Sequence, residues 1–342
     1  MATIKEIAML AGVSRGTVDR VLNNRGSVSL DKESKVLEIA KALNYTPNIA
    51  GKTLAVRKKA LKFGYILMGT TLSNPFFIDV VDGIDSRAAE IREFGVSVEI
   101  RFAKLEDPIL QVKLIDELLD EGISGLAITP VNHPLVSRRI CDLTESGFPV
   151  VTANTDIPGC GRIAYVGSDY FRSGQTAAGL MNQICGGSAY VGVVIGSPWV
   201  MCHSERLSGF KQRIEEEYDG IRIAGTVVNN DDDIESYIVT KQLLEANPEI
   251  NALFLVAAGV VGACRAAEDL GLKGKLKIVG YDATEATKEL IRSGDIAVTI
   301  TQEPFVQGSK PLSILLDYVG MGIMPEKDVY HTSLGIVIKE NL

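Results

Sequence analysis

Residues 3–23 read TIKEIAMLAGVSRGTVDRVLN, and apolar residues recur at helical spacing on both sides of Gly12. Thr3 can cap a first helix that Gly12 ends, and Ser14 can cap a second helix. The positions predicted to face inward are Ile4, Ile7, Ala8 and Ala11 in the first helix, then Thr17, Val18, Val21 and Leu22 in the second. Two short helices joined by a turn at Gly12 have the spacing of a helix-turn-helix.

A third helix is predicted to follow, and the helical unit to end at Asn44-Tyr45-Thr46-Pro47. Its predicted inward positions are Val36, Leu37, Ala40 and Leu43. Up to Ala60 the chain has 11 Lys and Arg against 5 Asp and Glu, a net of +6, and the remainder has 24 against 38, a net of -14. A basic small unit on an acidic body favours a polyanionic partner for the small unit.

These helices resemble the headpiece of the LacI family of bacterial repressors, and the likeness extends over about 55 residues. It continues through the family's boundary signature at Leu43-Asn44-Tyr45-Thr46-Pro47-Asn48. The resemblance implies that Arg15 and Gly16 select the operator sequence. It also implies phosphate or base contacts from Thr3, Ser14, Thr17, Arg20 and Asn23. The alternative is a structural three-helix bundle that happens to be basic.

Two positions depart from the family's pattern. Gly16 has no side chain with which to contact a base, and Asp19 stands where a small Ser is usual. A carboxylate near phosphates weakens DNA binding unless it accepts from a cytosine amino group or pairs with Arg15 or Arg20. The sequence therefore leaves the operator sequence open.

Residues 48–55, NIAGKTLA, correspond to the family's hinge helix, which folds when two copies meet over DNA. The resemblance implies that Leu54 inserts into the minor groove. Gly51 lowers helix stability by about 1 kcal/mol relative to Ala, so we expect a hinge that is disordered off DNA. The run Ala50-Gly51-Lys52-Thr53 also looks like the end of a P-loop, but Thr46 replaces a required Gly and no strand precedes it.

From Phe63 onward, short strands rich in β-branched residues alternate with helical segments. The predicted strands lie at 63–68, 96–102, 125–129, 150–153, 190–195, 221–228, 252–256, 277–281 and 297–301. The pattern begins again near Tyr190 after a break at 158–161, which favours two doubly wound lobes over a closed barrel. We therefore predict an α/β fold in which a small all-α headpiece precedes two doubly wound parallel-sheet lobes.

The predicted domains are a headpiece at 1–47, a hinge and linker at 48–60, and an effector-binding and dimerisation domain at 61–342. Within the last domain, lobe one is predicted at about 61–158 plus 294–321 and lobe two at about 159–293 plus 322–342.

The body resembles the type I periplasmic sugar-binding fold, especially its ribose-binding branch. The matching segments are 73–77, 129–132, 205–210, 279–282 and 301–304. All of them lie at the carboxyl ends of predicted strands or at the helix starts that follow. Open parallel sheets bind their ligands at this edge.

A sugar offers hydroxyls to acceptors and to Arg, and an apolar ring face to aromatic side chains. The resemblance implies polar contacts from Asn74, Asn132, Arg206, Asp282 and Gln302, with Phe76 and Phe77 as a wall. At or near further contact positions lie His133, Asn154, Cys202 and Asn230.

Purely structural roles are the alternative: Asn74 and Asp282 could cap helices, and the two Phe could belong to the core. For Arg206 and Asp282 we favour ligand contact, because an unpartnered charge in a cleft is costly.

Ala257-Ala258-Gly259 follows a predicted strand where the family normally supplies Asn or Asp, and Asn132 replaces a usual acid. Fewer acceptors indicate a ligand with fewer hydroxyls at that end, or an anionic or modified sugar. Trp199 fits the cleft mouth and the core equally well.

The five cysteines, at 141, 160, 185, 202 and 264, form no C-x-x-C pair and no metal-ligand spacing, and their number is odd. We expect reduced thiols in a cytoplasmic protein. The charged N-terminus predicts no secretory signal, and glycines interrupt the longest uncharged stretch, 173–204, so no membrane span is expected. Asp231-Asp232-Asp233 is predicted to cap a helix rather than to bind calcium. We expect neither a metal nor a cofactor.

No nucleophile elbow, dinucleotide fingerprint or metal cluster occurs in the sequence, which argues against an enzyme. The body alone would suit the solute-binding protein of a sugar transporter, but the basic headpiece and the lack of a signal argue against that class. We expect a repressor that binds a pseudo-palindromic double-stranded DNA operator and responds to a sugar or sugar-like effector. The chain ends without a heptad tail, which predicts a homodimer.

Overall fold

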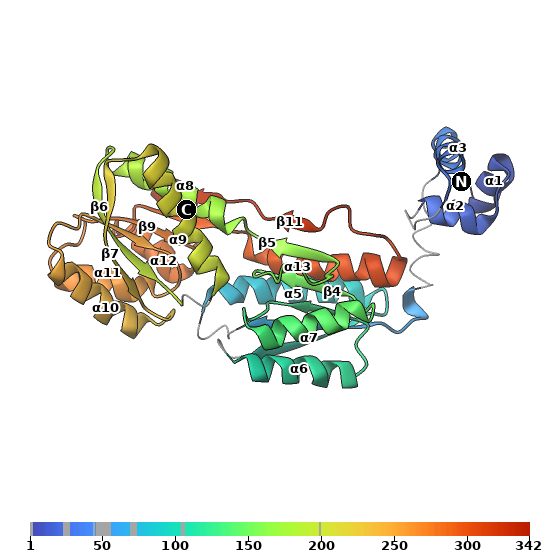
Figure 1. The fold of residues 1–342 in the computed structure, drawn as a ribbon, viewed down its shortest axis with the longest axis horizontal. Coiled ribbons are helices and arrows are strands. Elements are labelled where there is room, and N and C mark those ends of the chain that lie inside the picture. Colours follow the sequence, from blue (N-terminus) through green and yellow to red (C-terminus); the bar gives the residue numbers. More distant parts are fainter. Residues whose placement is uncertain are drawn as a thin grey trace.

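The computed structural model describes residues 3–22, 28–43, 45, 56–68, 74–103, 107–197 and 200–342. Along the chain, three short helices precede two lobes that each contain a sheet (Figure 1). The predictions for Asn23, for the hinge with Leu54, and for Trp199 lie outside the described residues.

The headpiece consists of α1 (Ile4–Ala11), α2 (Arg15–Leu22) and α3 (Leu30–Ala42). The predicted capping of α1 is confirmed, because the Thr3 hydroxyl accepts from the Glu6 amide while the Glu6 carboxylate accepts from the Thr3 amide. Gly12 ends the helix in the left-handed region, at φ 70°. At α2, the Ser14 hydroxyl accepts from the Thr17 amide at 3.1 Å.

The headpiece core contains Ile7, Ala8, Ala11, Val18, Val21, Val36 and Ala40. Leu37 and Leu43 were predicted to face inward, and this is wrong: their exposed fractions are 47% and 37%. Each residue turns about 100° around a helix. Leu37 therefore points away from the face on which Val36 and Ala40 lie.

The first lobe is built on a parallel sheet with the strand order β11-β5-β4-β3-β1-β2. The strands are β1 (Lys62–Met68), β2 (Ser97–Ala103), β3 (Gly125–Ile128), β4 (Val150–Ala153), β5 (Ala164–Gly167) and β11 (Val329–His331). Its helices are α5 (Phe76–Arg92), α6 (Pro108–Asp120), α7 (Pro134–Glu145) and α13 (Pro304–Leu315).

Alternation along β1 places its side chains in two cores, one on each face of the sheet. Phe63, Tyr65 and Leu67 belong to the core with α5 and α13. Ile66 and Met68 belong to the core with α6 and α7.

The second lobe has the strand order β12-β10-β9-β8-β6-β7, parallel except for β12. The strands are β6 (Ala189–Ile195), β7 (Ile221–Val228), β8 (Ala252–Leu255), β9 (Lys277–Tyr281), β10 (Val298–Thr301) and β12 (Gly335–Val337). The helices are α8 (Tyr170–Ile184), α9 (Met201–Glu217), α10 (Asp233–Ala246), α11 (Val260–Asp269) and α12 (Glu285–Arg292). A π-helix at Leu316–Met321 follows α13, and a 3-10 turn at Lys339–Asn341 follows β12.

The nine predicted strands are confirmed within one residue at each end, but their division between lobes needs correction. β5, assigned to lobe two, pairs with β4 in the first sheet. β10, assigned to lobe one, pairs with β9 in the second sheet, and β11, assigned to lobe two, pairs with β5. The break at 158–161 is a turn within lobe one, and the pairing partners of a strand are not encoded in its own residues.

The chain therefore passes between the lobes three times: after β5, after β10 and after β11. Hydrogen bonds tie these crossings together. The hydroxyls of Ser168 and Thr332 lie 2.8 Å apart, and the Ser333 amide donates to the Glu303 carboxylate at 2.6 Å. The three segments thus lie side by side.

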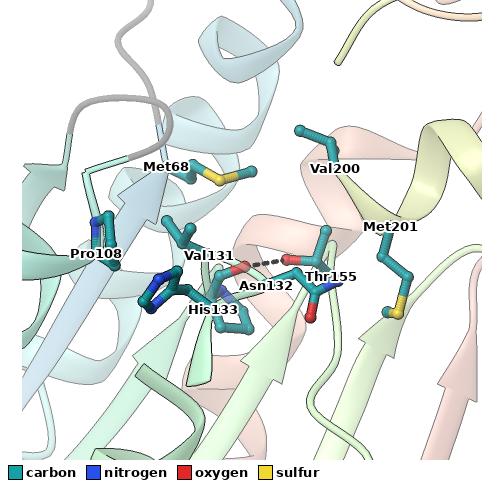
Figure 2. A pocket seen from close by; sticks show the side chains of 9 residues that line it. Met68, Pro108, Val131, Asn132, His133, Thr155, Val200 and Met201 are labelled. Atoms are coloured by element: carbon teal, nitrogen blue, oxygen red, sulfur yellow. Dashed lines mark hydrogen bonds between the residues drawn. The ribbon is translucent and has the colours of Figure 1, made fainter. Parts of the chain in front are cut away.

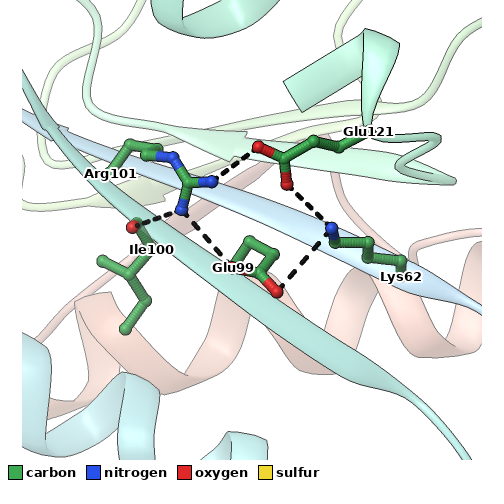
Figure 3. A network of polar contacts seen from close by, with 5 residues as sticks. All are labelled: Lys62, Glu99, Ile100, Arg101 and Glu121. Carbon is green, nitrogen blue, oxygen red and sulfur yellow. Dashed lines mark hydrogen bonds and ion pairs between the residues drawn. The ribbon is translucent and has the colours of Figure 1, made fainter. Parts of the chain in front are cut away.

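Charged side chains hold the edge strand β2 against its neighbours (Figure 3). Lys62 on β1 and Arg101 on β2 both reach Glu121, at 2.8 and 2.7 Å, and Arg101 also lies 3.4 Å from Glu99. The hydrogen bond from Lys62, followed by that from Arg101, holds the pKa of Glu121 below its usual value. These groups are partly exposed, so the network fixes the geometry of this edge more than it adds stability.

The structure pairs Cys141 on α7 with Cys160 in the turn before β5 as a disulfide, with Cα atoms 4.7 Å apart. The expectation that all five cysteines are free is therefore wrong, and the free thiols are Cys185, Cys202 and Cys264. Spacing along the chain did not indicate the pair because only the fold brings α7 beside this turn. Among the described residues, no helix has the length and apolar character needed to cross a membrane.

We expect Cys141→Ser to lower the free energy of unfolding by about 3 kcal/mol, because the disulfide closes a loop of intermediate length in the unfolded chain. Urea unfolding in buffer without added oxidant or reductant measures the change. Reducing the unsubstituted protein with dithiothreitol should lower its free energy of unfolding by a similar amount. Cys185→Ser serves as the control, since Cys185 is a free thiol. Equal urea midpoints for Cys141→Ser and the unreduced protein would contradict the pairing.

Candidate functional site

A polar pocket lies between the lobes, where strands of both sheets end at their carboxyl edges. The first lobe contributes Met68, Asn74, Phe76, Phe77 and Asn154. The second side contributes Val200, Cys202, His203, Arg206, Asp231, Ala257, Ala258, Asp282 and Gln302. Of the residues predicted to bind ligand, eight line this pocket: Asn74, Phe76, Phe77, Asn154, Cys202, Arg206, Asp282 and Gln302.

Arg206 occupies the inner side of the pocket and is only 3% exposed. Its guanidinium lies over the ring of Tyr281, 3.8 Å from the centroid, and 5.1 Å from the centroid of Tyr170. One terminal nitrogen donates to the carbonyl of Val256 at 2.8 Å, while Nε has no partner among the described residues. A buried donor without a partner is costly, so Nε is available to a ligand acceptor.

The position of Arg206 depends on the close approach of α8 and α9. A Cβ atom on Gly174 would lie 1.9 Å from the carbonyl oxygen of Arg206. A Cβ atom on Gly209 would lie 1.9 Å from the carbonyl oxygen of Phe171. Only glycine permits this contact, which places the guanidinium between the two tyrosine rings.

Asp282 follows β9 in the left-handed backbone region, at φ 64°, and its carboxylate accepts from the Gln302 amide at 2.8 Å. Burial raises the pKa of Asp282 above its usual value, although Arg206 and the Gln302 hydrogen bond act in the opposite direction. The Gln302 amide oxygen is buried without a partner among the described residues. The second side of the pocket thus has a free donor, Nε of Arg206, and a free acceptor, the Gln302 oxygen, among the described residues.

Two charged residues of the pocket were missed by the sequence analysis. Nε2 of His203 lies 3.9 Å from the Asp231 carboxylate, which also accepts from the Ala258 amide at 3.1 Å. Asp231 therefore brings a carboxylate beside Ala257 and Ala258, the place where the sequence lacks the family's acceptor. The predicted cap of α10 is confirmed at Asp232, while the left-handed backbone of Asp231 turns this neighbour toward the pocket.

The charge state of His203 is set by opposing effects. Burial lowers its pKa, but the neighbouring Cys202 and then Asp231 raise it, and the net pKa lies above the usual value. The raised pKa favours the protonated form of this imidazole, in which Nε2 beside Asp231 can donate to an anionic or hydroxyl oxygen. The only sequence signal for this pair was the position of His203 one turn before Arg206 on α9.

Asn74, Phe76 and Phe77 in the first lobe have the structural roles considered as alternatives, and they also line the pocket. Asn74 accepts from the Phe76 amide at 3.0 Å, which is the predicted helix-start role, and it also lines the pocket. Phe76 and Phe77 meet edge to face with centroids 5.3 Å apart, and they belong to the core as well as to the pocket wall.

Three predicted ligand residues do not line this pocket. Asn132 and His133 line a neighbouring cavity of about 170 Å³ (Figure 2). The Asn230 amide instead donates to the carboxylate of Glu235 at 3.0 Å. Residues directly after a strand reach this pocket only when the backbone turns them toward it, which their order in the sequence does not specify.

In the headpiece, the predicted DNA contacts Thr3, Ser14, Arg15, Gly16 and Arg20 are exposed, and Thr17 is half-buried. The Ser14 and Thr17 hydroxyls lie 2.9 Å apart, and Arg20 donates to the Gly16 carbonyl at 3.2 Å. These contacts order polar groups at the start of α2.

Asp19, the departure from the family pattern, is half-buried on α2. Burial, followed by the charge of Asp19, raises the pKa of Tyr45. The carboxylate is therefore close enough to the end of the helical unit to act on the Tyr45 hydroxyl.

Two parallel-sheet lobes around a polar pocket, preceded by a helix-turn-helix, define a ligand-binding regulator of mixed α/β architecture. The chain belongs to the periplasmic binding protein domain family, which matches residues 64–322, and its residues 3–48 match the bacterial regulatory proteins of the lacI family. Both descriptions concern binding or regulatory proteins rather than enzymes.

Among curated relatives, the ribose operon repressor of Halalkalibacterium halodurans is 28% identical over 93% of this chain and 91% of its own length. The probable HTH-type transcriptional repressor ExuR of Bacillus subtilis is 34% identical over 46% of this chain and 44% of its own. A solute binding protein of Burkholderia graminis, solved with D-arabinose, has a TM-score of 0.76 at 24% identity, covering 82% of this chain and 96% of its own, which supports the fold.

We expect Asp282→Asn to keep or raise the free energy of unfolding at pH 7. The folded-state pKa is raised, so the native state prefers the neutral carboxyl and loses stability as the pH rises through that pKa. The amide removes this loss, and its advantage should shrink as the pH falls toward the ordinary Asp pKa of about 3.9. Urea unfolding from pH 4 to pH 8 measures the trend. A strongly destabilised variant at pH 7 would instead assign Asp282 a structural role.

Proposed function

We propose that this protein is a sugar-responsive, DNA-binding transcriptional repressor that acts in the cytoplasm as a homodimer and has no catalytic activity. The proposal rests on the presence of two kinds of domain in one chain. One is a headpiece with an exposed polar start of α2, and the other is a two-lobed body whose pocket contains unpartnered buried polar groups. The alignment with the ribose operon repressor supports this reading, because it extends over 93% of the chain.

The proposed DNA contact uses two headpieces on the half-sites of a pseudo-palindromic operator. The residues assigned to it are Thr3, Ser14, Arg15, Gly16, Thr17, Arg20 and Asn23, with Leu54 in the minor groove. The opposite net charges of the N-terminal segment and the body favour contact through the headpieces alone.

The proposed effector is a sugar or a sugar-like molecule held between the lobes. Asp282, Gln302 and Asp231 supply acceptors, Arg206 supplies donors, and Phe76 and Phe77 supply an apolar surface. Because the contacts come from both lobes, the ligand binds most tightly to one interlobe arrangement. Its effect on DNA affinity cannot exceed its difference in affinity for the two arrangements.

We expect the full chain to bind operator duplex with two chains per site and with a steep dependence on salt, since basic headpieces release counterions from phosphates. The operator is obtained by selection from random duplexes. A chain without residues 1–60 should lose this binding, as measured by fluorescence anisotropy, and should retain a dimer in light scattering. Tight sequence-specific binding by the truncated chain would contradict the proposal.

We expect Arg206→Ala to weaken the effector response by about tenfold or more, since a buried sugar oxygen loses a charged donor. The measurement is the sugar dose dependence of operator affinity, with the sugar taken from a thermal-shift screen. Arg213→Ala on the same helix is the matched control, because Arg213 pairs with Glu217 outside the pocket. Equal responses in both variants would mean that the effector binds elsewhere.

A further inference from the structure

The second cavity, which contains Asn132 and His133, adjoins the polar pocket. The two share Met68 and Val200 in their linings. The second cavity is the larger, at about 170 Å³ against about 40 Å³ for the polar pocket. Figure 2 shows Met68 and Val200 on one side of it and Val131 and His133 on the other. A molecule bound in the polar pocket can thus extend into this space.

The chemistry of the lining changes between the two spaces. The second cavity is walled mainly by the apolar side chains of Met68, Pro108, Pro130, Val131, Val200 and Met201. It contains none of the charged side chains of the polar pocket, which are His203, Arg206, Asp231 and Asp282. Methionine side chains are flexible and adapt to apolar groups of different shape.

Several polar groups of this lining are engaged within the protein, while the Asn132 amide and Nε2 of His133 have no hydrogen-bond partner among the described residues. The Thr155 hydroxyl donates to the Pro130 carbonyl at 2.8 Å, as drawn in Figure 2. The Val131 amide donates to the buried side chain of Gln111 at 2.8 Å. Nδ1 of His133 accepts from the Leu135 amide at 3.2 Å.

A second sugar ring would find partners only in Asn132 and Nε2 of His133, so most of its hydroxyls would lose water without gaining a hydrogen bond. An alkyl or aryl group loses nothing of this kind and gains from burial. The polar pocket has the opposite preference, since the buried Gln302 oxygen and the Arg206 Nε lack partners among the described residues.

We propose that the effector is bipartite, with a hydroxylated head in the polar pocket and an apolar substituent that passes between Met68 and Val200 into the second cavity. An alkyl or aryl glycoside is the simplest molecule of this class. The inference rests on the proposed function, because it takes the effector to bind between the lobes.

The test is calorimetric titration of the full chain with D-ribose and D-glucose and with the methyl, butyl and hexyl β-glycosides of each. We expect affinity to rise about fourfold for each methylene that enters the cavity, until the cavity is filled. The same glycosides should change operator affinity in the same order.

Substitutions in the wall of the second cavity test whether the gain in glycoside affinity arises there. Met201→Gln keeps the length of the side chain and makes it polar, so the ratio of hexyl to methyl glycoside affinity should fall several-fold. Met324→Gln, at an exposed methionine outside both linings, should keep the ratio of the unsubstituted protein. Val131→Thr repeats the test with little change of volume, in case Met201→Gln disturbs the start of α9.

The outcomes separate the two proposals. Binding of the free sugars with no gain along the glycoside series, or an unchanged ratio in both Met201→Gln and Val131→Thr, overturns the bipartite effector and leaves the repressor proposal intact. If no free sugar and no glycoside binds or alters operator affinity, the sugar-responsive function fails, and the subsite fails with it.

Discussion

The pocket depends on one costly arrangement, a guanidinium buried between two tyrosine rings. Arg206 is held over Tyr281 and Tyr170, and both rings are themselves fixed by their hydroxyls. The Tyr281 hydroxyl lies 3.1 Å from that of Ser173, and the Tyr170 hydroxyl donates to the Asn154 carbonyl at 2.6 Å. The last bond reaches from α8 into the first lobe, so the group that supplies the positive charge is connected to both halves of the body.

A buried cation requires negative partners, and this requirement organises the remaining polar residues. Charge attraction to Arg206 opposes the rise in the pKa of Asp282 that burial causes. The Asp231 carboxylate lies 3.9 Å from Nε2 of His203, the residue one turn before Arg206 on α9. Buried polar groups without partners lower stability in general, and here they form a set that a hydroxylated ligand can satisfy.

Local signals in the sequence predicted the headpiece and the strands well. The Thr3 cap, the left-handed Gly12 and the nine strands all depend on residues that are close in the chain. Pairings between distant segments were not predictable in this way. The placement of β5 and β11, the Cys141–Cys160 pair, and the separation of Asn132 from the polar pocket all depend on which segments the fold brings together. Asp231 was missed because a run of three acids reads as a helix start, and only a backbone turn distinguishes its first member.

The three crossing segments form the hinge between the two lobes. Ser168, Thr332, Ser333 and Glu303 fasten these segments to one another. The fully buried Gln307 donates to the Gln302 carbonyl and accepts from the Asn154 amide. Gln302 and Asn154, which line the pocket from opposite lobes, therefore share one partner. Hydrogen bonds between the segments oppose their sliding past one another, which favours opening and closing of the lobes about a common axis. A ligand in the pocket then changes one quantity that the rest of the molecule can respond to, the angle between the two lobes, whatever the detailed shape of the ligand.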